Sequence, residues 1–124
     1  MVAVDTSTVV AYLSSLPGTD VEQFDGHLVA GSAVLPPVAL SELLSDPLMP
    51  KEHRELVLGL PQIEIKEGYW VRTAATRSIV LAQKLRARLP DALIVQSCID
   101  ADLPLLTRDS DFRHFARLCG LKLA

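Results

Sequence analysis

Short hydrophobic runs alternate along this chain with longer segments that have helical periodicity. The run Val2-Ala3-Val4 ends at Asp5, and the run Leu105-Leu106 ends at Thr107. Runs of this length, bounded by polar or turn-forming residues, are typical of buried β-strands. The pattern predicts strands at residues 2–5, 33–35, 63–65, 105–107 and 121–123.

The segments between these runs have the start and stop signals of helices. Thr6 to Thr8 offer hydroxyl groups that can cap a helix, Gly31 can end one, and Pro36-Pro37 can open one. Strands that alternate with helices indicate an α/β fold with a parallel sheet. Helices are predicted at residues 6–16, 20–30, from 36 through Glu42, 51–59, 68–89, 90–102 and 111–118.

The size and composition indicate one globular domain. The chain has 124 residues, of which 49% are hydrophobic and 22% charged. No apolar run reaches the roughly 20 residues that cross a bilayer, and Asp5 interrupts the N-terminus too early for a secretory signal. We therefore expect a cytoplasmic protein without a membrane partner, in which Cys98 and Cys119 are buried thiols.

The basic residues are distributed unevenly. The net charge is −3, yet residues 1–50 contain no Lys or Arg, and all 12 basic residues follow. This asymmetry is compatible either with a surface for a polyanion in the later part of the chain or with solvated helix faces. The residues that could form such a surface are Arg72, Arg77, Lys84, Arg86, Arg88, Arg108, Arg113 and Arg117.

Four carboxylates stand at positions that the predicted topology can bring together. Asp5 and Asp109 follow predicted strands, and Glu42 and Asp91 belong to predicted helices. In an open parallel sheet, ligand sites form outside the carboxyl ends of the strands. Taken singly, these residues could also be a turn residue, helix caps and the polar face of a helix. The hypothesis of a site therefore depends on their convergence.

A cluster of carboxylates would require a counter-charge. Each acid raises the pKa of its neighbours, whereas a divalent cation reverses that effect. Because no Cys or His has a ligand-like spacing, the donor set favours Mg²⁺ or Mn²⁺, which commonly serve phosphoryl chemistry. The sequence lacks the HExxH, GxSxG and GxxxxGK[ST] motifs of other hydrolases and nucleotide-binding proteins.

Three segments resemble one known family. They are "VDTSTVVAYL" near the start, "PPVALSELLS" in the middle and "LPDALIVQSCIDADLPLLTRDSDFRHF" near the end. Their order and spacing are similar to those of PIN-domain proteins, and most similar to the VapC-type toxins of bacterial toxin–antitoxin pairs. The resemblance implies a three-layer α/β/α sandwich with a short parallel central sheet.

The resemblance also assigns roles to individual residues. It implies that Asp111 joins the acidic site, and that Ser7 and Thr107 support that site by hydrogen bonding. The implied catalytic acids are Asp5, Glu42, Asp91 and Asp109. The implied metal ligands are Asp5, Asp91, Asp109 and Asp111.

The activity implied by the resemblance is Mg²⁺- or Mn²⁺-dependent endoribonuclease cleavage of structured RNA, such as transfer or ribosomal RNA. The implied protein partners are a VapB-like antitoxin and a second copy of the chain, for which Tyr69 and Trp70 are candidate contacts. Because the first 50 residues lack positive charge, we expect RNA to approach the later helices, with Arg108 and Arg113 nearest the scissile phosphate.

Two other classes of function remain as alternatives. One is a PIN-like module that binds RNA or a protein without catalysis, which the loss of an acid would favour. The other is a metal-dependent phosphatase or a phosphoacceptor receiver, because both place an aspartate after a first strand. The segment "DTST" lacks the second aspartate of the phosphatase, and no lysine follows the late strand as in a receiver.

Overall fold

Three short parallel strands form the centre of the protein. The computed structural model describes residues 1–124, with β1 at Val2–Val4, β2 at Ala33–Val34 and β3 at Leu105–Leu106. The strand order is β2-β1-β3, and Ala3 of β1 pairs with Val34 on one side and with Leu105 on the other. The first strand of the chain is therefore the central one, and the predicted parallel sheet is confirmed.

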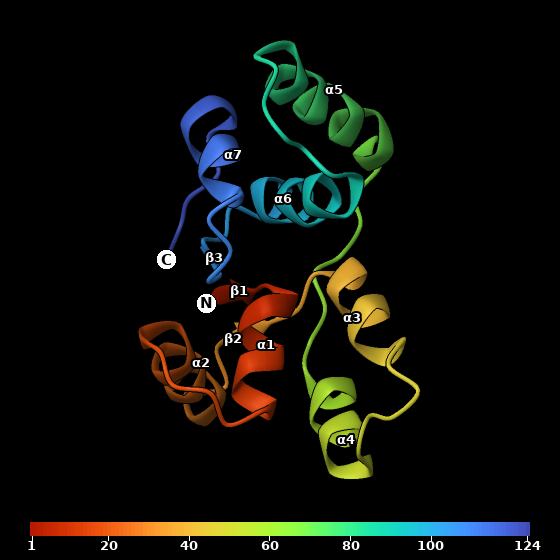
Figure 1. Ribbon diagram of the computed structural model, residues 1–124. Coiled ribbons are helices and arrows are strands. Elements are labelled where there is room, and N and C mark those ends of the chain that lie inside the picture. Colours follow the sequence, from red (N-terminus) through yellow and green to blue (C-terminus); the bar gives the residue numbers. More distant parts are fainter.

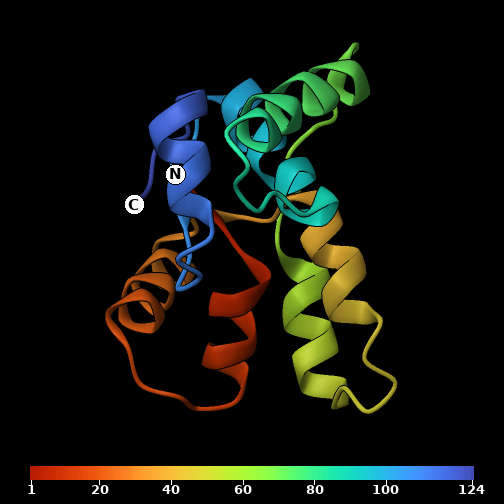
Figure 2. The same cartoon turned by 45° about the horizontal axis from the view of Figure 1, so that its top comes forward.

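Helices cover both faces of this sheet, which confirms the predicted three-layer α/β/α arrangement (Figure 1). Helices α1 and α2 lie on one face, and α6 lies on the other with α5 and α7 packed against it. Helix α3 contacts α1, α6 and α4, and Figure 2 shows α3 and α4 side by side. The helices are α1 (Thr6–Leu13), α2 (Thr19–Ala30), α3 (Pro37–Leu44), α4 (Lys51–Gly59), α5 (Tyr69–Ala82), α6 (Leu89–Ala101) and α7 (Phe112–Cys119).

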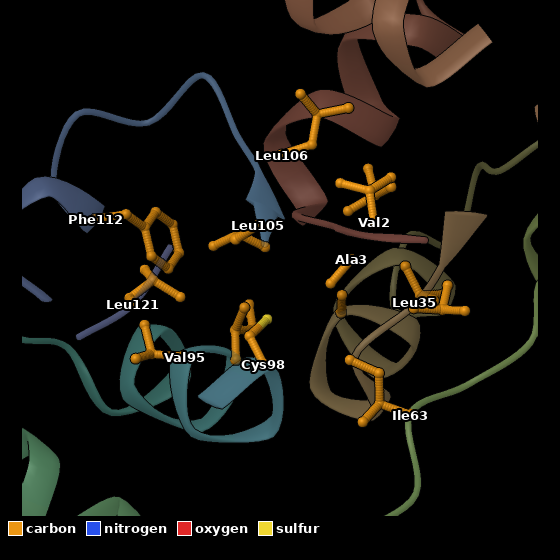
Figure 3. Close-up of a cluster of buried hydrophobic side chains, with 14 of the residues drawn as sticks. Val2, Ala3, Leu35, Ile63, Val95, Cys98, Leu105, Leu106, Phe112 and Leu121 are labelled. Carbon is orange, nitrogen blue, oxygen red and sulfur yellow. The ribbon is translucent and has the colours of Figure 1, made fainter. Parts of the chain in front are cut away.

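The hydrophobic core lies on both faces of the sheet. Adjacent strand residues point to opposite faces, so Leu106 points to the same side as Val2, while Leu105 lies with Phe112 on the side of α6 (Figure 3). Leu105 and Val4 are fully buried, and Leu106 is 2% exposed. Strands buried on both faces are continuous hydrophobic runs without alternation, as these are.

Helix α6 is the most enclosed helix and sets the position of the candidate site. Its residues from Ala92 to Cys98 are buried except Leu93, which is half-buried. Pro90 lies in its first turn, where the missing N–H group costs no hydrogen bond. Because α6 leads into the parallel strand β3, its first turn lies near the carboxyl ends of the strands.

No helix in the structure is both long and apolar enough to span a bilayer.

Two predicted strands are reduced to single bridges. Leu35 bridges to Gln62, and Leu105 bridges to Leu123. The backbone N–H of Ile63 donates to the carbonyl of Leu35 at 3.0 Å, but Ile65 is already exposed, so the pairing does not continue. Both segments extend the sheet by one contact each rather than forming strands.

The predicted helix over residues 68–89 is shorter in the structure. Helix α5 ends at Ala82, and the chain turns at Lys84, which has a left-handed φ of 57°. The following residues form a loop that leads to the first turn of α6. The sequence has good helix formers throughout this turn, so propensity gave no sign of the break.

Candidate metal centre

Asp5 follows β1 and is the N-cap of α1. One of its carboxylate oxygens, Oδ2, accepts hydrogen bonds from Ser7 Oγ at 2.6 Å and from Thr107 Oγ1 at 2.9 Å. The residue is 4% exposed, and this burial raises the pKa of its carboxyl group, although the hydrogen bonds from Ser7 and Thr107 oppose the shift. Ser7 and Thr107 therefore fix the orientation of Asp5, and their supporting role in the reaction stays a prediction.

Three further aspartates converge beside Asp5. Asp91 lies in the first turn of α6, Asp109 follows β3, and Asp111 precedes α7. One carboxylate oxygen from each of them lies within 4.8 Å of the others. The segment that carries two of them is fixed by its own hydrogen bonds, since Asp109 Oδ1 accepts from the backbone N–H of Asp111 at 2.9 Å. We call Asp5, Asp91, Asp109 and Asp111 the acidic centre.

The charges of the acidic centre act on one another. The pKa of Asp91 is raised to about 6, first by burial and then by the nearby charges of Asp5 and Asp109. The positive charge of Arg88 opposes this shift. The surroundings of Asp91 therefore disfavour its ionised form in the absence of another cation.

Arg88 lies among the acids and is a site residue that the sequence pattern alone did not single out. Its Nε lies 3.4 Å from Asp91 Oδ2, and its Nη2 lies 3.6 Å from Asp109 Oδ2 and 4.0 Å from Asp111 Oδ2. Arg86 approaches Asp111 alone, at 3.9 Å. In the sequence, Arg88 is only one member of the broad set of basic residues after residue 50. Its place three residues before Asp91, at the start of a helix, is the signal that could have singled it out.

Glu42 lies at the edge of the site. It is exposed on α3, and its Oε1 accepts a hydrogen bond of 2.8 Å from Thr6 Oγ1, the residue that follows Asp5. Like Asp5, it lies outside the group formed by Asp91, Asp109 and Asp111, but unlike the charge of Asp5, its charge is not among those that raise the pKa of Asp91. The structure thus connects Glu42 to Asp5 through a neighbour without adding it to the acidic centre.

The two arginines predicted to contact RNA have different surroundings. Arg108 donates from Nε and Nη2 to the carboxylate of Asp20, with both distances at 2.9 Å, and from Nη2 to the carbonyl of Pro17. Arg113 is exposed, and its Nε donates to the carbonyl of Ser110. Arg108 therefore ties the loop after β3 to the start of α2, while Arg113 is accessible. Their role in RNA binding stays a prediction.

The donor set of the acidic centre fits a hard divalent cation. All of its side chains offer carboxylate oxygens, which Mg²⁺ and Mn²⁺ prefer over the imidazole and thiolate groups that suit zinc. One oxygen from each of Asp91, Asp109 and Asp111 lies within 4.8 Å of the others, so these three side chains fit a shared ion.

Comparison with protein families identifies the family of this chain. The family model described as the PIN domain matches residues 2–118, which is nearly the whole chain. The chain belongs to the PIN-domain family. PIN domains are generally nucleases that use divalent metal ions. Membership in this family therefore argues against the phosphatase and receiver alternatives. Among curated protein sequences, no match is found.

Solved structures share this PIN fold over their whole length. VapBC2 from Rickettsia felis, bound to a DNA fragment from its promoter, gives a TM-score of 0.76 at 16% identity, covering 100% of this chain and 98% of that chain. FitAcB from Neisseria gonorrhoeae gives 0.70 at 18% identity, with coverage of 99% and 96%. FitAB bound to an IR36 DNA fragment gives 0.70 at 15% identity, with coverage of 100% and 94%. These similarities concern the fold.

Proposed function

We propose that this PIN domain is a metal-dependent endoribonuclease and the toxin component of a VapBC-like toxin–antitoxin pair. The observation that supports the nuclease is the convergence of Asp5, Asp91, Asp109 and Asp111 at the carboxyl edge of the sheet. The acids come from three separate parts of the chain and leave like charges close together, an arrangement that a divalent ion would stabilise.

In this proposal, the acidic centre holds Mg²⁺ or Mn²⁺. A bound ion of this kind supplies an activated water and stabilises negative charge on the oxygen that leaves the phosphodiester. Ser7 and Thr107 keep Asp5 in one orientation through its Oδ2. Glu42 is exposed and accepts a hydrogen bond from Thr6, the neighbour of Asp5, and we assign it the role of accepting a proton from water. Hydrolysis then needs no nucleophilic side chain.

The proposed substrate is structured RNA, such as transfer or ribosomal RNA. The positive charge close to the acids comes from Arg86, Arg88 and Arg113, all of which are exposed. These arginines could contact the phosphates of an RNA bound at the acidic centre. Of the two arginines predicted from the sequence, Arg113 is the better candidate, because the guanidinium of Arg108 is already bound by Asp20.

The proposed protein partners are a VapB-like antitoxin and a second copy of the chain. The VapBC2 and FitAB relatives are toxin–antitoxin complexes, which supports the antitoxin. An apolar surface on α5 and α6 supports the dimer, since Trp70 is 67% exposed and Leu89 is 50% exposed beside Leu93. Tyr69, in contrast, is buried and donates from its hydroxyl group to the carbonyl of Leu93. Light scattering after size exclusion should find a dimer that Trp70→Ala converts to a monomer.

RNA cleavage tests the nuclease. We would incubate purified, antitoxin-free protein with total RNA in Mn²⁺, Mg²⁺ or EDTA and map the fragment ends. The site variant is Asp91→Asn, and its matched control is Asp102→Asn at the opposite end of the same helix, where the side chain is 82% exposed. Discrete metal-dependent fragments lost in the first variant alone are expected. Folded, metal-binding protein that cleaves no RNA would favour the non-catalytic binding module.

A further inference from the structure

Arg88 places the positive charge of a side chain inside the acidic centre. It is the one basic residue within 4.0 Å of three acids of that centre, and it approaches the same atom, Oδ2, of Asp91, Asp109 and Asp111. A divalent ion shared by these acids would bind among carboxylate oxygens that lie within 4.8 Å of one another, the region that the guanidinium of Arg88 already occupies. The guanidinium and the ion would therefore compete for one position.

We propose that Arg88 is the built-in counter-ion of the acidic centre and that a divalent metal ion must displace it. The inference rests on the metal site of the proposed function. Three carboxylates with oxygens within 4.8 Å of one another would repel one another without a cation, and Arg88 supplies one in the ion-free protein. When the metal ion takes its place, the two positive charges repel, and the guanidinium moves outward.

The contacts of Arg88 are weak enough for this exchange. Its side chain is 50% exposed, and its distances of 3.4, 3.6 and 4.0 Å are long for charge-assisted hydrogen bonds. Arg72 shows the opposite case in the same protein, because it holds Asp100 with two donors at 3.0 and 2.6 Å. Arg88 thus neutralises the acids without locking them.

The displaced guanidinium has a further use. Arg88 precedes α6 and stays at the rim of the acidic centre after it leaves the acids. A phosphate that approaches the bound ion passes this rim, and a planar guanidinium can bind two of its oxygens. Metal loading would then free a phosphate-binding group that the ion-free protein keeps occupied, so ion binding and RNA binding would reinforce each other.

Direct measurement of Mn²⁺ binding tests the proposal. We would titrate the ion-free protein with Mn²⁺ and follow the free ion by electron paramagnetic resonance at low ionic strength. Arg88→Gln keeps a polar side chain and removes its charge, and Arg117→Gln on the exposed part of α7 is the matched control. We expect Mn²⁺ to bind about threefold to tenfold tighter to Arg88→Gln, and within about twofold of wild type to Arg117→Gln. Unchanged or weaker binding to Arg88→Gln would overturn the proposal.

Thermal unfolding gives a second readout that does not depend on activity. Because a ligand stabilises the folded state more when it binds more tightly, a fixed Mn²⁺ concentration should raise the Tm of Arg88→Gln more than that of wild type. An equal rise in both proteins would contradict the exchange. This outcome can be separated from RNA cleavage. Protein that binds Mn²⁺ but does not cleave RNA would refute the nuclease and leave the exchange standing. Protein that cleaves RNA, with equal Mn²⁺ affinity in wild type and Arg88→Gln, would refute the exchange and leave the nuclease standing.

Discussion

The two ends of α6 hold the same chemical group in opposite electrostatic states. Near its C-terminus, Asp100 accepts hydrogen bonds from Arg72 at 3.0 and 2.6 Å and from Gln96 at 2.8 Å, and its pKa is lowered, first by Arg72. At its N-terminus, Asp91 has one donor, Arg88 at 3.4 Å, and its pKa is raised to about 6. Asp100 has more hydrogen-bond donors than acidic neighbours, so it stabilises the fold. Asp91 has more acidic neighbours than hydrogen-bond donors, so it is suited to bind a cation.

The largest effect expected from this comparison is the loss of cleavage in Asp91→Asn. Removing one charged ligand from the acidic centre should lower the metal-dependent rate at least about 100-fold, since losses of supporting groups alone reach that size. The ion-free fold should survive, because the change also relieves repulsion with Asp5 and Asp109. Fragment yields over time and a thermal melt measure the two effects. A variant that keeps more than a tenth of the wild-type rate would contradict the assignment.

The next effect is the pH dependence of metal affinity. Protons compete with the ion for Asp91, so Mn²⁺ affinity should fall by up to about tenfold per unit as the pH drops below 6, and should level off above about pH 7. Titrations from pH 5 to 8 would measure the slope, which should be smaller in Asp91→Asn. A slope that is equal in both proteins would show that another group controls the site.

The raised pKa of Asp91 also makes the stability of the ion-free protein depend on pH, and this stability changes in the opposite direction to the metal affinity. Between its ordinary pKa of 3.8 and about 6, the folded ion-free protein binds more protons at Asp91 than the unfolded chain does. The contribution of Asp91 to the unfolding free energy therefore declines as the pH rises through this window and is constant above it. Denaturant titrations of wild type and Asp91→Asn across this range should show the gap between them changing only below about pH 6.

A smaller effect is expected at the other end of the helix. Asp100→Asn removes the charge that pairs with Arg72, so it should lower the unfolding free energy by about 1 kcal/mol and Tm by roughly 4 °C. The loss is no larger because solvent reaches Arg72 and weakens the pair. Cleavage at 25 °C should be unchanged. Since the pKa of Asp100 is lowered from 3.8, its stabilisation is present above that pH and is lost as the pH falls through the lowered value. A loss of cleavage in this variant would remove the distinction between the two ends.

The smallest effect separates the two arginines. Arg72→Lys replaces a two-donor contact with a single charge and should lower Tm by roughly 2 °C, whereas Arg88→Lys should leave Tm within about 1 °C of wild type. Thermal melts of the ion-free proteins measure both changes. Equal shifts would mean that Arg88 holds its acids as firmly as Arg72 holds Asp100.

Sequence reasoning predicted the elements with strong local signals. The central run Val2-Ala3-Val4, the helix that Gly31 ends and the helix that Pro37 opens are all present. The segments at 63–65 and 121–123 have strand-like patterns, but their pairing depends on partners distant in sequence, and each reaches one bridge. The end of α5 at Ala82 also depends on tertiary packing, because its sequence continues with good helix formers.

The acidic centre was predictable because its acids follow structural signals. Asp5 and Asp109 follow hydrophobic strands, and Asp91 follows a proline at a helix start, so their positions indicated where they would lie. Arg88 was not singled out, because its contacts depend on the loop that precedes α6. The pairing of Arg108 with Asp20 was also hidden, since these residues are 88 positions apart.

The central place of β1 affects how the protein can fold during synthesis. Strand β1 is synthesised well before Thr107, which donates a hydrogen bond to Asp5 and lies 102 positions later in the chain. Strand β1 can pair with β2 as soon as both have emerged, but it must wait for β3, and such distant pairing is slow to form. A nascent chain that has not reached β3 also lacks Asp109 and Asp111. The acidic centre can therefore assemble only after the segment that carries these two acids has been synthesised.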